Sequence, residues 1–141
     1  MRALLVSSLL ASSLVIGATG CSRDRDRAPA RGTVSTVSTV SVDQLDRMLA
    51  NHECQAVDAN GDATRRRMGV IPGAVLLRDM DAVDQLPADR TRGLVFYCAN
   101  TACGASREAA ERAITAGYTH VQVLPDGIAG WVKAGKKTTS I

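Results

Sequence analysis

The chain has 141 residues, a length that suits one domain and a tail but not two full domains. Hydrophobic residues (45%) and charged residues (22%) occur in ordinary globular proportions, which excludes disorder throughout the chain. Aromatic residues make up only 3%, which argues against a stacking platform for single-stranded nucleic acid. From Thr36 onward, Lys and Arg equal Asp and Glu in number, so the part expected to fold lacks a basic surface for nucleic acid.

Residues 1–20 have the pattern of an export signal. Arg2 supplies a positive charge, and residues 3–18 carry none. This run is short and serine-rich for a membrane span, which needs about 20 apolar residues, so we expect a secretory signal peptide. The small residues directly before Cys21 resemble the lipobox of bacterial lipoproteins. That resemblance implies cleavage before Cys21, lipidation of Cys21 and a membrane anchor in the bacterial cell envelope, facing the periplasm; the alternatives are a plain signal peptide or an uncleaved anchor.

The segment after Cys21 has the composition of a linker. It is charged, then small and polar, with Pro29 and Gly32 and no apolar periodicity. We therefore expect a flexible tether over residues 21–35, followed by a folded domain over residues 36–141. The alternating Arg and Asp residues of the tether are more typical of a solvated spacer than of a partner-binding strip.

The first half of the domain predicts two strands and one helix. Residues 37–40 form a short strand candidate, and Ser41 is placed to cap a helix over residues 42–52. A second strand is expected at residues 55–58. The polar stretch 59–69, with three consecutive arginines, is expected to be a turn, either merely solvated or guiding anions.

The second half continues the alternation of strands and helices. The expected elements are a strand at 74–77, a short helix at 81–86, a strand at 93–97, a helix at 105–116, a strand at 121–124 and a terminal helix from about residue 126. The strand at 93–97 is apolar throughout, as expected for a strand buried on both faces. On the helix at 105–116, Ile114 is expected to face inward and Glu108 to pair with Arg112.

Repeated strand-then-helix units predict an α/β fold. We expect a mostly parallel five-stranded sheet with helices on both faces. In such a sheet, ligands bind beyond the carboxyl ends of the strands. Asp58 and Cys98 each lie at such an end in this prediction.

Cys98 follows the buried strand and precedes a loop of small residues and a helix. Backbone N–H groups of the loop and the positive end of the helix are expected to surround one centre, where they bind an anion and lower the pKa of a thiol below its usual ~8.5. Cys98 is therefore the predicted nucleophile, the alternative being a buried structural cysteine. The predicted substrate- or anion-binding loop comprises Ala99, Asn100, Thr101, Ala102, Cys103, Gly104, Ala105 and Ser106.

Two stretches of the chain resemble the signatures of rhodanese-like domains. In the first, Asp58 ends a strand and residues 69–74 read Gly-Val-Ile-Pro-Gly-Ala. The second contains the cysteine loop, Gly117-Tyr118 and, at residues 127–131, Gly-Ile-Ala-Gly-Trp. The resemblance covers about residues 37–137 and implies the rhodanese-like three-layer fold.

The resemblance also implies a sulfurtransferase that uses no metal or cofactor. The Cys98 thiolate would attack a sulfane donor such as thiosulfate, become a persulfide, and pass the outer sulfur to a thiophilic acceptor. The implied partners are a small sulfur-containing anion or thiol and an optional protein acceptor. Asp58 and Arg107 are expected to support the site, Asp58 by ordering nearby loops.

The chain departs from the family pattern in its cysteine loop. Ser106 lies eight positions after Cys98, where six is common, so a larger anion is conceivable and an arsenate-type reductase stays an alternative. A tyrosine phosphatase needs an arginine six positions after the cysteine, and that position is Gly104. Asn60 and Val70 stand where the family commonly has Arg and His.

Cys103 adds a second thiol to the loop. It is either a resolving thiol or a small residue that merely fits, so a thiol–disulfide reductase using Cys98 and Cys103 and a non-catalytic persulfide carrier stay alternatives. Cys54 is expected at the opposite sheet edge, too far from Cys98 for a disulfide. No metal site is expected, because the spacing of the two histidines and the three cysteines after residue 50 matches no common zinc pattern.

Overall fold

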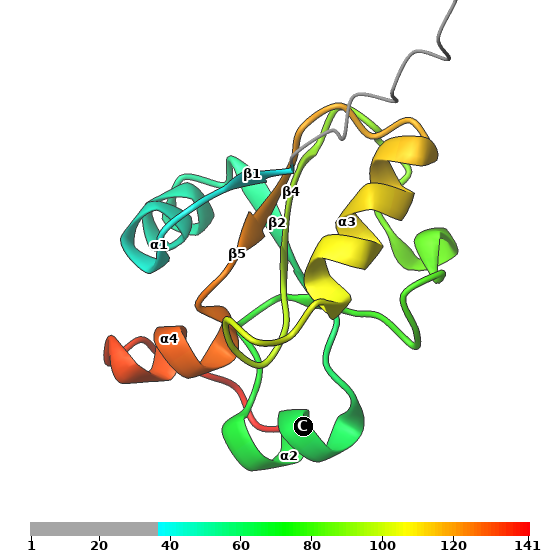
Figure 1. The fold of residues 1–141 in the computed structure, drawn as a ribbon. Helices are drawn as coiled ribbons and strands as arrows, with labels where there is room; N and C mark the ends of the chain where they lie inside the picture. The colour runs from blue at the N-terminus through cyan, green and yellow to red at the C-terminus, as the bar shows by residue number, and fades with distance from the viewer. Residues whose placement is uncertain (1–36) are drawn as a thin grey trace, which may run out of the picture. The chain divides into compact units, whose positions relative to one another are not determined.

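The computed structural model describes residues 37–141 (Figure 1). The predicted signal peptide over residues 1–20, the predicted tether over residues 21–35 and the predicted lipid-bearing Cys21 lie outside the described residues. Within residues 37–141, none of the helices combines the length and the apolar composition needed to cross a membrane.

The described part of the chain alternates strands and helices, as predicted. Its elements are β1 (Ser38–Thr39), α1 (Val42–Ala50), β2 (Cys54–Asp58), α2 (Asp62–Met68), β3 (Val75–Leu76), the 3₁₀ helix η1 (Val83–Gln85), β4 (Gly93–Tyr97), α3 (Ala105–Thr115), β5 (Val121–Leu124) and α4 (Gly127–Lys133).

The five strands form one sheet in the order β1-β5-β4-β2-β3, and every pairing is parallel. This confirms the predicted α/β class. Strand β4 lies at the centre, between β5 and β2, and Tyr97 at its end is paired with Asp58 at the end of β2. The carboxyl ends of the two strands that carry Asp58 and Cys98 are therefore neighbours.

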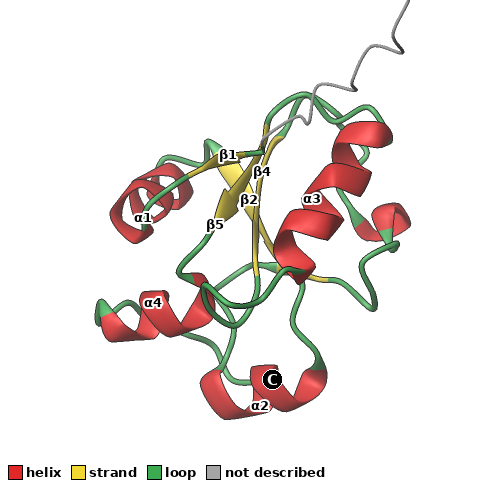
Figure 2. Cartoon of the chain, in the orientation of Figure 1, coloured by secondary structure: helices red, strands yellow, loops and turns green. Residues whose placement is uncertain are grey.

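Helices cover both faces of the sheet (Figure 2). Along β4, Leu94 and Phe96 pack into the core that contains α3, whereas Val95 and Tyr97 pack into the core that contains residues of α1 and α4. All four side chains are fully buried. The apolar run at residues 93–97 thus reflects a strand that is buried on both faces, as predicted.

Ser41 caps α1 as predicted, through a reciprocal capping box. The Ser41 hydroxyl accepts a hydrogen bond from the Gln44 backbone N–H at 3.3 Å, and the Gln44 side chain accepts one from the Ser41 N–H at 2.8 Å. On α3, the predicted pair between Glu108 and Arg112 is present at 3.0 Å.

Two local predictions were wrong. The stretch 59–69 is not a turn throughout, because residues Asp62–Met68 form α2. An acidic residue in its first turn and three arginines in its last turn match the helix dipole, a pattern that the polar composition concealed. Ile114 was expected to face inward but is 37% exposed, since the buried face of α3 is built from Ser106 and alanines.

A buried ion pair joins α2 to the carboxyl edge of the sheet. The Arg65 guanidinium lies 3.4 Å from the Asp58 carboxylate and donates to the backbone oxygens of Asp58 (3.1 Å) and Leu77 (2.7 Å). The Asp58 side chain is fully buried and that of Arg65 is 7% exposed. The sequence suggested that Arg65, within a run of three arginines, is solvated or guides anions. In the structure Arg65 is instead buried in this ion pair, whereas Arg66 and Arg67 are exposed.

Removing Arg65 should destabilise the fold strongly. Arg65→Ala leaves the Asp58 carboxylate buried without its counter-charge, and we expect a loss of about 3–5 kcal/mol in the free energy of unfolding. Arg66→Ala, which removes an exposed arginine from the same helix, should change it by less than about 0.5 kcal/mol. Urea denaturation of both variants measures the difference, and equal stabilities would refute this role for Arg65.

Candidate active site

Cys98 lies directly after β4, at the sheet edge where β2 also ends. The Ala59 N–H donates to the Tyr97 carbonyl at 2.9 Å, so the chain leaving β2 is attached to the residue before Cys98. Asp58 and Cys98 thus meet at one edge, as the topology predicted. The Asp58 carboxylate accepts the Asn60 N–H at 2.6 Å, and with the Arg65 contacts this supports the expected loop-ordering role.

The first turn of α4 holds the backbone of the cysteine loop. The N–H groups of Ile128 and Ala129 donate to the carbonyls of Cys98 (2.8 Å) and Ala99 (3.0 Å). Gly127 approaches so closely that a Cβ there would lie 2.4 Å from the Cys98 oxygen, and its φ of +59° also favours glycine. Gly127 is therefore a packing requirement of the site as well as a turn residue.

Between Cys98 and α3, the loop folds back through a turn at Asn100. The Asn100 carbonyl accepts the Cys103 N–H at 3.0 Å, and its side-chain oxygen accepts the Ala102 N–H at 3.0 Å. These two N–H groups therefore donate within the loop and not to Cys98. This is contrary to the prediction that the whole loop surrounds one centre. The turn instead reverses the chain, so that Cys103 lies beside Cys98.

Cys98 is held as a neutral thiol. Its side chain is 1% exposed, lies 3.3 Å from the Ser106 hydroxyl and donates to the Cys103 carbonyl oxygen at 3.1 Å. Burial and the neighbouring Cys103 side chain raise the pKa of Cys98 above its ordinary value, and the hydrogen bonds from Ser106 offset only part of this. The prediction of a lowered pKa for Cys98 was therefore wrong for this arrangement.

Cys103 has the lowered pKa instead. Burial alone would raise the pKa of the Cys103 thiol, but hydrogen bonds from the Cys98 thiol and from the N–H groups of Ala99 and Ala105 outweigh it. Within the coupled pair, the charged form is therefore more favoured on Cys103 than on Cys98: the N–H groups of Ala99 and Ala105 act on the Cys103 sulfur, and that of Ser106 acts on the Cys98 sulfur.

A cavity of about 210 Å³ opens beside the two thiols. Cys103 and Ser106 line it together with Arg107, whereas Cys98 does not. Arg107 is exposed and places a positive charge at this cavity. This position is compatible with the predicted supporting role of Arg107, which stays a prediction. A reagent entering here meets Cys103 and Ser106 before it reaches Cys98.

Tyr97 and Cys54 are buried groups that stay neutral. Burial and the negative charge of Asp58 raise the pKa of Tyr97, whose hydroxyl accepts the Ile71 N–H at 3.0 Å. Burial raises the pKa of Cys54 to about 11. Cys54 is paired with Gly93, at the strand ends remote from Cys98, as predicted. Nowhere in residues 37–141 do three His, Cys, Asp or Glu side chains gather in a way that could hold a metal ion.

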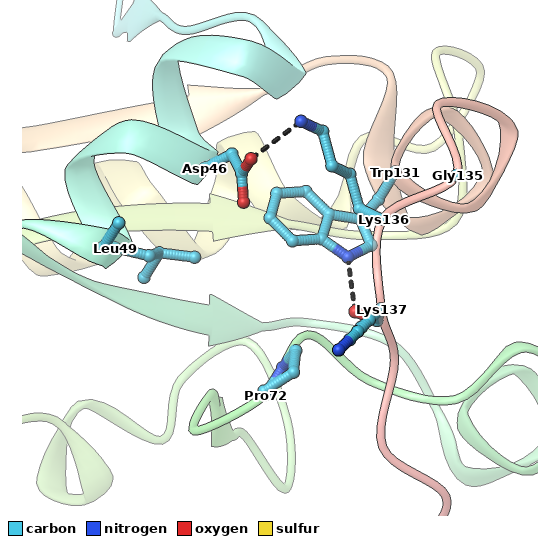
Figure 3. A pocket seen from close by; sticks show the side chains of 8 residues that line it. Asp46, Leu49, Pro72, Trp131, Gly135, Lys136 and Lys137 are labelled. Atoms are coloured by element: carbon cyan, nitrogen blue, oxygen red, sulfur yellow. Dashed lines mark hydrogen bonds and ion pairs between the residues drawn. The ribbon is translucent and has the colours of Figure 1, made fainter.

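A larger cavity, about 420 Å³, lies between α1 and the C-terminal segment (Figure 3). Asp46 and Leu49 face Trp131 and Lys136 across it, and the Trp131 indole N–H donates to the Lys137 carbonyl at 2.8 Å. Lys136 forms ion pairs with Asp43 and Asp46. No residue of the cysteine loop lines this cavity, so the thiol chemistry belongs to the smaller one.

The comparisons with known proteins agree with this architecture. The family model of the rhodanese-like domain matches residues 41–134. No curated protein is significantly similar to the chain in sequence.

Solved structures share the fold at low sequence identity. A human single-domain sulfurtransferase is 20% identical, with a TM-score of 0.58 over 69% of this chain and 96% of its own. A thiosulfate sulfurtransferase from Pseudomonas aeruginosa is 20% identical, with a TM-score of 0.62 over 73% of this chain and 20% of its own. A protein of unknown function from Rhodopseudomonas palustris, described as a possible tyrosine phosphatase, is 21% identical, with a TM-score of 0.64 over 74% of this chain and 86% of its own.

Alkylation should distinguish the two thiols of the loop. At about pH 7, iodoacetamide should modify Cys103 at least about ten times faster than Cys98, because a thiol with a lowered pKa is ionised earlier and Cys103 lines the cavity. Modification of Cys98 should speed up as the pH rises toward its higher pKa. Fragmentation of the tryptic peptide 93–107, which contains both cysteines, reports each rate. Faster modification of Cys98 at pH 7 would contradict the charge assignment.

Gly127→Ala should loosen the cysteine loop. The new Cβ would collide with the backbone of Cys98 and Ala99, so we expect lower stability and faster alkylation of Cys98. Gly73→Ala is the matched control, because Gly73 also has a positive φ (+74°) but open space around it, so it should cost only about 1–2 kcal/mol. If the two variants leave Cys98 equally protected, the contact with α4 does not hold the loop.

Proposed function

The chain belongs to the rhodanese-like domain family, and we propose that it is a sulfurtransferase that carries sulfane sulfur as a persulfide on Cys98. The observation that carries the proposal is the place of Cys98. It lies between the central strand β4 and the N-terminus of α3, with the Ser106 hydroxyl 3.3 Å from its sulfur. A thiol in this setting has what nucleophilic sulfur chemistry needs: a rigid position and hydrogen-bond donors for a charged sulfur.

The first half of the reaction loads the cysteine. Cys98 loses its proton to water, and its thiolate attacks the outer sulfur of a donor such as thiosulfate. The sulfur–sulfur bond of the donor breaks, and sulfite leaves with the electron pair. The hydroxyl and N–H of Ser106 stabilise the negative sulfur during this step, since both hydrogen bonds favour the charged form of Cys98.

The second half unloads the persulfide. A thiophilic acceptor, such as cyanide or a thiol, attacks the outer sulfur, and the bond to Cys98 breaks to regenerate its thiolate. No net redox change occurs in the protein, because the same sulfur atom is received and given away. A small donor anion suits the cavity of about 210 Å³, where the exposed Arg107 supplies attraction.

Phosphate ester chemistry is less favoured by the loop. Bidentate binding of a phosphoryl group needs an arginine within the loop, six positions after the cysteine, and Gly104 stands there. Arg107 belongs to the first turn of α3. The description of one structural neighbour as a possible tyrosine phosphatase is therefore not carried over to this chain.

Release of sulfite tests the proposed function directly. The reduced full chain, freed of reductant and mixed anaerobically with thiosulfate, should release about one sulfite per chain, because each Cys98 accepts one sulfur atom. In a separate run, excess cyanide that is present from the start should capture the outer sulfur as thiocyanate. Sulfite and thiocyanate assays follow the two halves of the reaction separately.

Two substitutions serve as the comparison. Cys98→Ser should abolish the release of sulfite, whereas Cys54→Ala removes a buried thiol remote from the loop and should leave it intact. If the parent releases no sulfite, or Cys98→Ser releases as much, transfer from thiosulfate through Cys98 is refuted.

A further inference from the structure

We propose that Cys103 is the resolving thiol of this site: it attacks the Cys98 persulfide, closes a Cys98–Cys103 disulfide and releases the transferred sulfur as hydrosulfide. The inference rests on the proposed function, since it begins with the persulfide on Cys98. It assigns an acceptor within the chain itself, so that the external partner becomes a thiol or dithiol reductant that reopens the disulfide.

The fold of the loop brings the two cysteines together. The turn stabilised by both oxygens of Asn100 reverses the chain within the five residues after Cys98. As a result, the Cys98 sulfur lies 3.1 Å from the carbonyl oxygen of Cys103. The Cys98 thiol lies near three possible acceptors, and two of them, the carbonyl oxygen and the sulfur, belong to Cys103, while the third is the Ser106 hydroxyl. The two side chains also interact with each other, so the Cys98 and Cys103 sulfurs are neighbours in the loop.

The charges suit this order of events. Three backbone N–H groups, those of Ala99, Ala105 and Ser106, act on the two sulfurs, and two of them favour the Cys103 thiolate. The thiolate that can attack is therefore Cys103, and the sulfur under attack is Cys98. A persulfide is attacked most readily by a neighbouring thiolate that is ionised near neutral pH.

The Cys103 carbonyl also favours a neutral Cys98 sulfur. A carbonyl oxygen at 3.1 Å repels a thiolate, but it is compatible with a thiol that donates to it or with the uncharged inner sulfur of a persulfide or disulfide. The loop conformation is thus compatible with the Cys98 sulfur both in the persulfide and in the disulfide that the proposed step forms.

Access to the site points in the same direction. Cys103 lines the cavity, while Cys98 is 1% exposed and does not. An external acceptor entering the cavity must pass Cys103 to reach the persulfide, whereas Cys103 is already adjacent to it. The intramolecular reaction has the advantage of proximity over any dilute external thiol.

The step balances in atoms and electrons. The Cys103 thiolate attacks the inner, Cys98 sulfur and forms the new disulfide bond. The persulfide first takes up a proton from water; the bond between the inner and outer sulfurs then breaks, and the outer sulfur leaves with the electron pair and that proton as hydrosulfide. The transferred sulfur is reduced and the two cysteines together are oxidised by two electrons, so an external thiol or dithiol must return those electrons before the next cycle.

The experiment uses thiosulfate alone, with no acceptor present. The reduced full chain is freed of reductant and mixed with thiosulfate under anaerobic conditions, and both sulfite and hydrosulfide are measured. The parent should release about one of each per chain, and its tryptic peptide 93–107 should become about 2 Da lighter. Cys21 and Cys54 fall in other tryptic peptides, so the mass change is specific to this pair.

Cys103→Ser separates this inference from the proposed function. This variant should release sulfite but no hydrosulfide, and its peptide 93–107 should stay about 32 Da heavier as a trapped persulfide. Adding a small thiol should then discharge it. Cys54→Ala is the control for loss of a thiol elsewhere and should behave like the parent.

Each other outcome contradicts a particular claim. If the parent releases sulfite but holds a stable persulfide without hydrosulfide, as the Cys103→Ser variant does, Cys103 does not resolve it and only this inference is wrong. If neither protein releases sulfite, the proposed function fails and the inference fails with it. Disulfide formed in the parent without hydrosulfide would overturn the inference, because the electrons would then have gone elsewhere.

Discussion

Burial of the central strand on both faces is the constraint from which the site follows. β4 packs Leu94 and Phe96 into one core and Val95 and Tyr97 into the other, so its end has no freedom of position. Cys98 comes directly after this end and inherits its burial. A rigid, dry position favours reproducible geometry, but it disfavours a charged sulfur. Hydrogen bonds from the rest of the loop to the two sulfurs offset part of this cost of burial.

The protein accommodates negative charge at this sheet edge in two ways. Asp58, fully buried, is matched by the Arg65 guanidinium, which also donates to two backbone oxygens. The thiol pair has no such counter-ion among its hydrogen-bond partners. Hydrogen bonds from backbone N–H groups and from the Cys98 thiol favour the charged form of Cys103 instead. The carboxylate pair thus serves the structure permanently. In the thiol pair, the hydrogen bonds favour the charged form of Cys103 over that of Cys98.

The sequence predicted the sheet well because its signals are local. A run of apolar residues marked β4, and Ser41 with Gln44 marked the start of α1. Helix α2 was missed because its polar composition is typical of a turn: Arg65 looked like one of three solvated arginines, and only the fold shows that it alone turns inward to Asp58. Ile114 was misassigned for a similar reason, since alanines rather than larger side chains fill the buried face of α3.

The sequence predicted that Cys98 and Cys103 are neighbours at the end of the central strand, but it did not predict their electrostatics. Position after a strand identifies Cys98, and spacing identifies Cys103 as a neighbour. Neither shows which sulfur the N–H groups face. That is decided by the turn at Asn100, which uses two of the loop's N–H groups internally.

The length of the loop and its second thiol are linked. With Ser106 eight positions after Cys98 rather than the six common in the family, the chain has room for the Asn100 turn. That turn uses the N–H groups of Ala102 and Cys103 within the loop, so these two groups do not stabilise a charged sulfur at the site. The same turn places Cys103 beside Cys98. For the proposed persulfide, a loop with fewer free N–H groups and an adjacent thiol favours discharge of sulfur over storage, and both properties arise from one change in backbone path.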